Sequence, residues 1–215
     1  MNQNVDVYRN IHKGIRGELF GVTIAAGQLD PADEGSRAEL RDRIDTVVWL
    51  LGMHAHHEDH WFLDMIEAHA PQIGERIVSD HALLDARIEG IGKAAHESET
   101  RKELHEVYLD LASFTGAYLA HQDLEERDLQ PILLAAVGPQ VMLETEQALI
   151  ASVPPADLAR TLAFMLPAMN LDDRGELLGG IRLGAPSEVF AGICALAGSV
   201  LEPADMAALS GRLGL

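Results

Sequence analysis

The sequence predicts an all-α protein, an up-down-up-down four-helix bundle with a C-terminal helical extension. Apolar residues recur with the period of about 3.6 residues that is typical of amphipathic helices. No stretch shows the alternation of β-branched and aromatic residues that is typical of strands. Hydrophobic residues make up 47% of the 215 residues, which is enough to bury a core. We therefore expect residues 1–137 to form the bundle and residues 138–215 to form the extension.

Each expected bundle helix ends at a recognisable stop signal. The first ends before a turn containing Pro31, and the second ends at Pro71, because proline disfavours helix in the residue before it. A polar link at 96–100 ends the third, and Gly138 with Pro139 ends the fourth. The expected helices cover residues 5–29, 37–70, 72–95 and 101–137.

The expected extension consists of shorter helices separated by prolines. It contains no histidine and no chemistry that the sequence identifies. We expect these helices to pack on the bundle or on a partner subunit, and a homodimer through them is left open. The expected helices cover residues 140–152, 157–169, 174–183, 187–201 and 204–213.

Charge and cysteine content exclude several classes of function. The formal net charge is −18, and so acidic a surface repels phosphate backbones and anionic lipid. We therefore expect no nucleic-acid or membrane partner. The single cysteine, Cys194, excludes a disulfide framework and a thiolate metal cluster. The first residues lack the basic and apolar regions of a signal peptide, so a cytoplasmic location is expected.

Polar residues interrupt the apolar stripe of every expected bundle helix. One such histidine is usually a hydrogen-bonded core or boundary residue, and one His-x-x-x-Glu pair is often a solvated contact. Here, however, four histidines and two glutamates occupy positions that the helical period assigns to the core. They are His12, His54, Glu58, His81, His121 and Glu125.

Antiparallel helices bring together residues that are equidistant from the connecting turn. The midpoint between His12 and the His54/Glu58 pair falls in the first turn, and the midpoint between that pair and His81 falls beside the second. The midpoint between His81 and the last pair, His121 with Glu125, falls close to the third link. The six side chains are therefore expected to meet in one layer of the bundle.

This layer is expected to bind metal, because two buried carboxylates without a cation would cost several kcal/mol each. Six nitrogen and oxygen ligands are too many for one zinc and suit two metals bridged by the glutamates. Imidazole disfavours magnesium and calcium. Two iron ions are the leading choice, with manganese second. No histidine follows a glutamate by three residues, so the Glu-x-x-His motif of ferritin-like di-iron bundles is absent.

Several other polar residues are sorted by their position relative to this layer. Second-shell contacts or a seventh ligand are expected from four residues, His57, Asp85, Tyr8 and Tyr118. His56 and His60 are placed in the second shell or on the surface, because His56 lies about 200° around the helix from His54. The remaining histidines, His69, His96 and His105, are expected on the surface.

These motifs together resemble the hemerythrin-like, or HHE cation-binding, family over about residues 5–137. The resemblance rests on the segments around His12, His54 to Phe62, Asp80 to Leu84, and His121 to Pro131. It implies a four-helix bundle with a non-haem di-iron centre that binds dioxygen or related small ligands. By position, the four histidines correspond to terminal ligands, and Glu58 and Glu125 to bridging carboxylates.

One departure from the family pattern bears on function. Oxygen-carrying hemerythrins have a fifth histidine, one turn from the third-helix ligand, whereas the neighbours of His81 here are Ile77 and Asp85. We therefore expect peroxide-reactive, catalase-like chemistry in oxidative or nitrosative stress defence, with O2, H2O2 or NO as ligand. The alternative is a module that binds, senses or stores oxygen, nitric oxide or iron without turnover. Whether the protein is an enzyme is left open.

Overall fold

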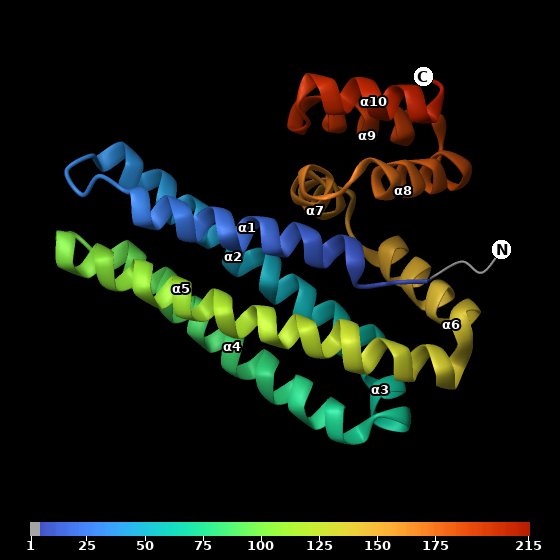
Figure 1. Ribbon diagram of the computed structural model, residues 1–215, viewed down its shortest axis with the longest axis horizontal. Helices are drawn as coiled ribbons and strands as arrows, with labels where there is room; N and C mark the ends of the chain where they lie inside the picture. Colours follow the sequence, from blue (N-terminus) through green and yellow to red (C-terminus); the bar gives the residue numbers. More distant parts are fainter. Residues whose placement is uncertain (1–4) are drawn as a thin grey trace. The chain divides into compact units, whose positions relative to one another are not determined.

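The computed structural model describes residues 5–215, which form helices with no β-strand among them. The predicted all-α class is therefore confirmed. Figure 1 labels the elements in chain order. They are α1 (Arg9–Gln28), α2 (Glu34–Trp61), α3 (Leu63–His69), α4 (Pro71–Glu97), α5 (Arg101–Leu124), the π-helix η1 (Glu125–Leu129), α6 (Gln130–Ser152), α7 (Pro155–Ala168), α8 (Leu171–Gly184), α9 (Ser187–Val200) and α10 (Pro203–Leu213).

The chain divides into two compact units. Among the described residues, the N-terminal unit comprises residues 5–9 and Glu18–Ala151, and the C-terminal unit comprises Asn10–Gly17 and Ser152–Leu215. The division of the chain into domains at residue 137 stays a prediction.

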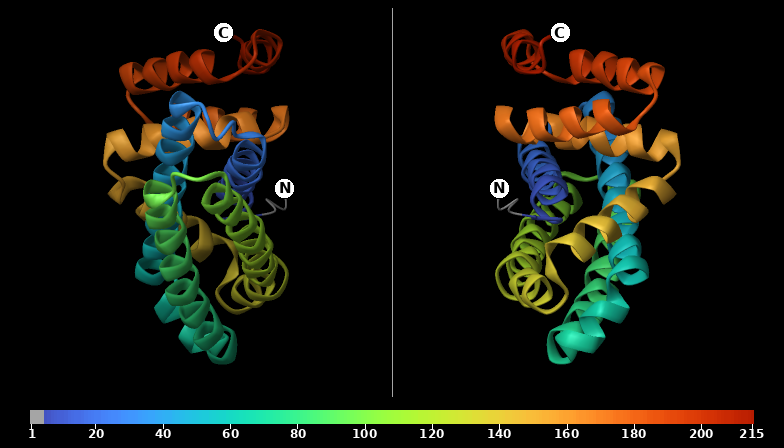
Figure 2. Two further views of the ribbon diagram at one scale, coloured as in Figure 1. Left: turned by 90° about the vertical axis from the view of Figure 1, so that its left-hand side faces the viewer. Right: turned by 90° about the vertical axis from the view of Figure 1, so that its right-hand side faces the viewer.

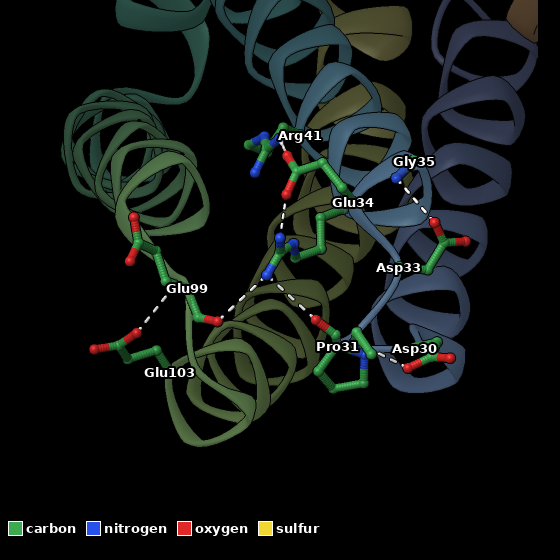
Figure 3. A network of polar contacts seen from close by, with 10 residues as sticks. Asp30, Pro31, Asp33, Glu34, Gly35, Arg41, Glu99 and Glu103 are labelled. Atoms are coloured by element: carbon green, nitrogen blue, oxygen red, sulfur yellow. Dashed lines mark hydrogen bonds and ion pairs between the residues drawn. The ribbon is translucent and has the colours of Figure 1, made fainter.

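Within the N-terminal unit, Figure 3 shows the polar contacts around Pro31 on the α1–α2 loop and Glu99 on the α4–α5 loop. One guanidinium nitrogen of Arg37 donates to the carbonyl of Pro31 at 3.2 Å and to that of Glu99 at 3.4 Å. This joins the α1–α2 loop to the α4–α5 loop. Each loop also caps the helix that follows it, because Asp33 accepts from the backbone N–H of Gly35 and Thr100 forms a capping box with Glu103.

Among the long helices of this unit, α4 contacts both α2 and α5. Figures 1 and 2 show α4 and α5 running side by side. Thr23 on α1 lies 3.0 Å from Thr115 on α5, measured between the hydroxyl oxygens. Glu18 on α1 forms an ion pair of 3.5 Å with Arg43 on α2.

Two of the expected helices are interrupted. The second divides into α2 and α3 at Phe62, although no proline or glycine in the sequence accounts for the break. The fourth changes from α5 to the π-helix η1 at Glu125, where the N–H of Gln130 donates to the carbonyl of Glu125. Pro131 follows directly, and its ring would clash with the carbonyl four residues earlier in an ordinary α-helix. The wider π turn relieves that clash.

Apolar layers lie on both sides of the polar positions along each helix. One core cluster contains Phe62, Ile66, Ile77, Leu129 and Leu133, which are all buried. On the other side of the polar positions in the sequence, α2, α4 and α5 bury further aliphatic residues. These include Ile44, Val47, Leu51, Ile88, Ile91, Val107 and Leu111. The polar residues therefore occupy an interior layer of the unit.

The C-terminal unit has its own apolar core. Leu162, Leu166, Leu178, Ala197 and Leu209 are buried together in it. Prolines begin α7 and α10 at positions where a missing N–H is tolerated. α8 begins earlier than expected, because Asn170 caps it by accepting from the N–H of Asp173.

No single described helix has both the length and the apolar character needed to cross a bilayer. One bent pair, Arg101–Ser152 with Pro155–Ala168, passes the same test jointly, by length and composition only.

Candidate metal centre

Two His-x-x-x-Glu pairs place a nitrogen and a carboxylate on the same helix face. His54 and Glu58 are one turn apart on α2, and His121 on α5 is one turn before Glu125 at the start of η1. α4 contributes His81 between them. All five residues are at most 5% exposed, although glutamate in particular is almost never buried without a partner.

Glu58 lies between two imidazoles. Its Oε1 is 3.2 Å from His54 Nε2, and its Oε2 is 3.2 Å from His81 Nε2. The two oxygens of one carboxylate therefore face histidines from two different helices. A bridging carboxylate has this arrangement, with each oxygen directed to a different centre.

Glu125 occupies an equivalent position on the other side of His81. Its Oε1 is 3.1 Å from His121 Nε2 and 3.8 Å from His81 Nε2. The rings of His81 and His121 meet edge to face, with centroids 4.9 Å apart. Three helical segments thus direct nitrogens and oxygens to one small region.

These donor atoms approach one another without hydrogen-bond alignment. Among the described residues, neither oxygen of Glu58 and neither Nε2 of His81 and His121 makes a hydrogen bond. Buried polar atoms that lie this close are normally aligned with each other, because an unsatisfied group costs about 1–3 kcal/mol. A cation between the atoms would satisfy all of them at once, so the donor set fits a metal ion.

The donor atoms fall into two groups that share both glutamates. The first group is His12, His54, Glu58 and Glu125, and the second is Glu58, His81, His121 and Glu125. Within each group, one ligand atom from every residue lies within 4.8 Å of the others. His12 is fully buried on α1 and belongs to the segment Asn10–Gly17 of the C-terminal unit, whereas the other five residues belong to the N-terminal unit. Within the N-terminal unit, the structure therefore brings Glu58, His81, His121 and Glu125 together, and the ligand role of the six residues stays a prediction.

Protonation of the cluster without metal reflects its excess negative charge. Burial, followed by the charge on Glu125, raises the pKa of Glu58 well above its ordinary value. Burial alone lowers the pKa of His81, but its contacts with Glu125 and Glu58 outweigh this effect and raise that pKa to about 11. The metal-free cluster therefore retains protons at sites that a metal ion would occupy.

Two aspartates contact the outer nitrogens of the histidines, a role that the sequence analysis missed. Asp59 Oδ1 is 2.9 Å from His81 Nδ1 and forms a hydrogen bond with it, whereas Asp80 Oδ2 lies 3.7 Å from His121 Nδ1, which is too far for a hydrogen bond. A carboxylate at Nδ1 holds the proton there and leaves the Nε2 lone pair for a metal. The available signal was the position of Asp59 directly after Glu58 and of Asp80 directly before His81.

The two predicted tyrosines flank the carboxylates. Tyr8 and Tyr118 are 2% and 3% exposed, and burial followed by the charges on Glu58 and Glu125 raises the pKa of each phenol well above 10.0. The ring of Tyr118 lies 5.7 Å from that of His121. Without metal, both phenols are therefore neutral at physiological pH.

The other two predicted neighbours are half-buried. Asp85 makes no hydrogen bond or ion pair with a described residue, and burial raises the pKa of its carboxyl. The ring of His57 lies 6.1 Å from that of His56, which is exposed. A role of either residue as a seventh ligand stays a prediction.

The remaining histidines lie at the surface. Exposed side chains are found at His56, His60, His69, His96 and His105. His96 forms an exposed pair with Asp45, with nitrogen–oxygen distances of 3.0 and 2.9 Å.

A comparison with known protein families identifies this part of the chain. The family model described as the hemerythrin HHE cation-binding domain matches residues 3–133, which include all six candidate ligands. Neither the curated proteins nor the solved structures gave a match to the chain. Since the family model covers more than half of the sequence, the chain belongs to the hemerythrin HHE cation-binding domain family.

Proposed function

We propose that the chain is a non-haem di-iron protein whose N-terminal helices form an up-down-up-down four-helix bundle around two metal ions. The proposed terminal ligands are His12 and His54 on one ion and His81 and His121 on the other. Glu58 and Glu125 are the proposed bridges. Iron suits a mixed imidazole and carboxylate set without sulfur, and manganese is the second choice.

The observation that carries this proposal is the sharing of both glutamates by the two donor groups. One ion would need a single group, and two independent sites would need separate carboxylates. Two groups with different histidines and the same pair of glutamates support a dinuclear centre. The raised pKa of Glu58 supports it as well, because two adjacent buried carboxylates need cationic charge.

The chain's own residues define how the centre is held. Asp59 fixes the ring orientation of His81 through Nδ1, so that Nε2 faces the carboxylates. The position one turn before His81 is Ile77, which is buried in an apolar cluster and offers no ligand atom. The fifth histidine of the oxygen carriers therefore has no counterpart there.

This shorter ligand set favours reaction with peroxide over reversible oxygen carriage. When bound, a pair of iron ions supplies redox chemistry toward dioxygen, peroxide or nitric oxide. Tyr8 and Tyr118 place neutral phenols beside the carboxylates, and the apolar layers on either side limit access of water. We propose peroxide decomposition in the cytoplasm, as part of oxidative or nitrosative stress defence, as the function.

Oxygen release tests this proposal directly. Iron-loaded wild-type protein should release oxygen from hydrogen peroxide, and His54→Ala should lose most of that activity, because one terminal ligand is missing. His69→Ala, which removes an exposed histidine, is the matched control and should behave like wild type. Equal, near-background rates in all three proteins would contradict the enzymatic function and favour binding or sensing of a small ligand.

A further inference from the structure

Two histidines outside the buried cluster form an exposed pair on α2. His56 and His60 are one helical turn apart, and their rings lie nearly parallel, with centroids 6.2 Å apart and an interplanar angle of 17°. Both side chains are exposed, and neither ring makes a hydrogen bond or ion pair with a described residue. Their ring nitrogens are therefore available to a ligand from solvent.

The spacing of His56 and His60 on the helix allows both rings to coordinate one metal ion. Residues four apart on a helix are neighbours on its surface, so two imidazoles at this spacing can chelate one metal through small side-chain rotations. One turn before His56 is Gly52, where an added Cβ would meet nothing within 4 Å. The space beside Gly52 is consequently open.

The charge and chemistry of the pair select a class of ligand. The chain has a formal net charge of −18, which raises the local concentration of cations. Imidazole binds late first-row divalent ions, with copper the strongest, and binds calcium and magnesium poorly. We propose that His56 and His60 form a second, surface metal site for a divalent transition ion, with water completing the coordination.

This site is distinct from the buried cluster and does not depend on its metal. His56 lies about 200° around α2 from His54, whose ring faces Glu58. The buried groups take their ligands from residues other than His56 and His60. The two sites can therefore be loaded and removed separately.

Trp61 provides a built-in reporter for the surface site. Its ring meets that of His60 edge to face, with centroids 5.2 Å apart. The sequence contains two tryptophans, so Trp49→Phe leaves Trp61 as the single source of indole fluorescence. Bound Cu²⁺ quenches nearby indoles, and its electron paramagnetic resonance spectrum reports nitrogen ligands.

The test is a Cu²⁺ titration of the metal-loaded protein in the Trp49→Phe background. We expect saturable quenching by one copper per chain, with nitrogen hyperfine structure and no loss of the metal already bound. His56→Gln and His60→Gln should each weaken copper binding roughly tenfold or more. The double variant should abolish binding, whereas His105→Gln, which changes an exposed histidine on α5 outside the pair, should have no effect.

Two results would overturn the proposal. Unchanged quenching and spectra in the double variant would place the copper elsewhere. Release of the resident metal in step with copper uptake would show that copper enters the buried cluster. Circular dichroism of each variant checks that folding is retained, and both substituted positions are exposed.

Discussion

Buried charge is handled differently in the buried cluster and in the C-terminal helices α7–α10. In α8, buried Asp173 forms an ion pair with Lys13, and buried Arg174 donates to the carbonyls of Leu166 and Pro167 and pairs with Asp205. Every one of these charges has an opposite charge or a carbonyl as its partner. This is the usual structural solution for a buried ion.

In the buried cluster of histidines and glutamates, Glu58 does not have such an ion pair with any lysine or arginine among the described residues. Its oxygens face imidazole nitrogens without hydrogen-bond alignment. Protons taken up by His81 and Glu58 supply part of the missing positive charge. The buried charges of α8 are thus paired with protein groups, whereas the cluster keeps buried polar atoms without hydrogen-bond partners among the described residues, and this arrangement fits a metal site.

Metal removal should have the largest effect. Without cations, the carboxylates of Glu58 and Glu125 repel each other in a desolvated layer, so the apoprotein should lose several kcal/mol of stability. Differential scanning calorimetry of the loaded and chelator-treated protein measures this loss. A melting temperature that does not change on complete metal removal would contradict a cation in the interior layer.

The apoprotein should also become less stable as the pH rises. The folded state keeps a proton on His81 up to a pKa of about 11, whereas the unfolded state loses it near 6.5, so stability falls across that range. The raised pKa of Glu58 acts in the same direction above 4.5. Thermal melts between these limits measure the slope, which should flatten once metal replaces the protons. If the stability of the apoprotein rose with pH or did not change, the proposed protonation of His81 and Glu58 in the folded state would be contradicted.

Removal of an outer contact should weaken metal binding moderately. Asp59→Asn leaves the ring of His81 without its carboxylate partner, and the loss in metal affinity should be about 10- to 100-fold. Asp45→Asn is the matched control, because it breaks an exposed aspartate–histidine contact of similar length with His96. Competition with a chelator of known affinity gives both values. If Asp59→Asn bound metal with the same affinity as wild type, Asp59 would have no role in metal binding.

The C-terminal helices should show a smaller effect, on stability alone. Arg174→Met leaves the carbonyls of Leu166 and Pro167 without their donor, which should cost roughly 1 to 3 kcal/mol. Metal content should not change, because α7–α10 contribute no residue to the donor groups. Urea unfolding and metal analysis of the same samples measure both quantities. A drop in bound metal per folded chain would show that Arg174 also affects metal binding, which would contradict the proposed difference between the two regions.

The sequence predicted the helical class and the two His-x-x-x-Glu pairs on one helix face because both follow from the helical period. His54 and Glu58 share a face since four residues make about one turn, and the short links set which levels meet. The prediction at Gly138 also agrees with the structure, since the backbone there is non-helical with a φ of 82°. Glycine accepts this conformation without strain.

Features that depend on tertiary contact were not predictable in this way. Asp59 contacts His81 across two helices, and its neighbours in the sequence are polar, so no periodic pattern marks it. The break at Phe62 has no proline or glycine signal. The π turn at Glu125 could have been anticipated from Pro131, because proline inside an apolar helix requires a local rearrangement.

Metal stoichiometry of the glutamate variants tests the central claim most directly. We predict two metal ions per chain in wild-type protein and in Glu106→Ala, which changes an exposed glutamate on α5. Glu58→Ala and Glu125→Ala should each bind one ion or none, because each glutamate belongs to both donor groups. Elemental analysis of the folded, purified proteins gives the ratio. Two ions per chain in both variants would contradict a centre bridged by these carboxylates.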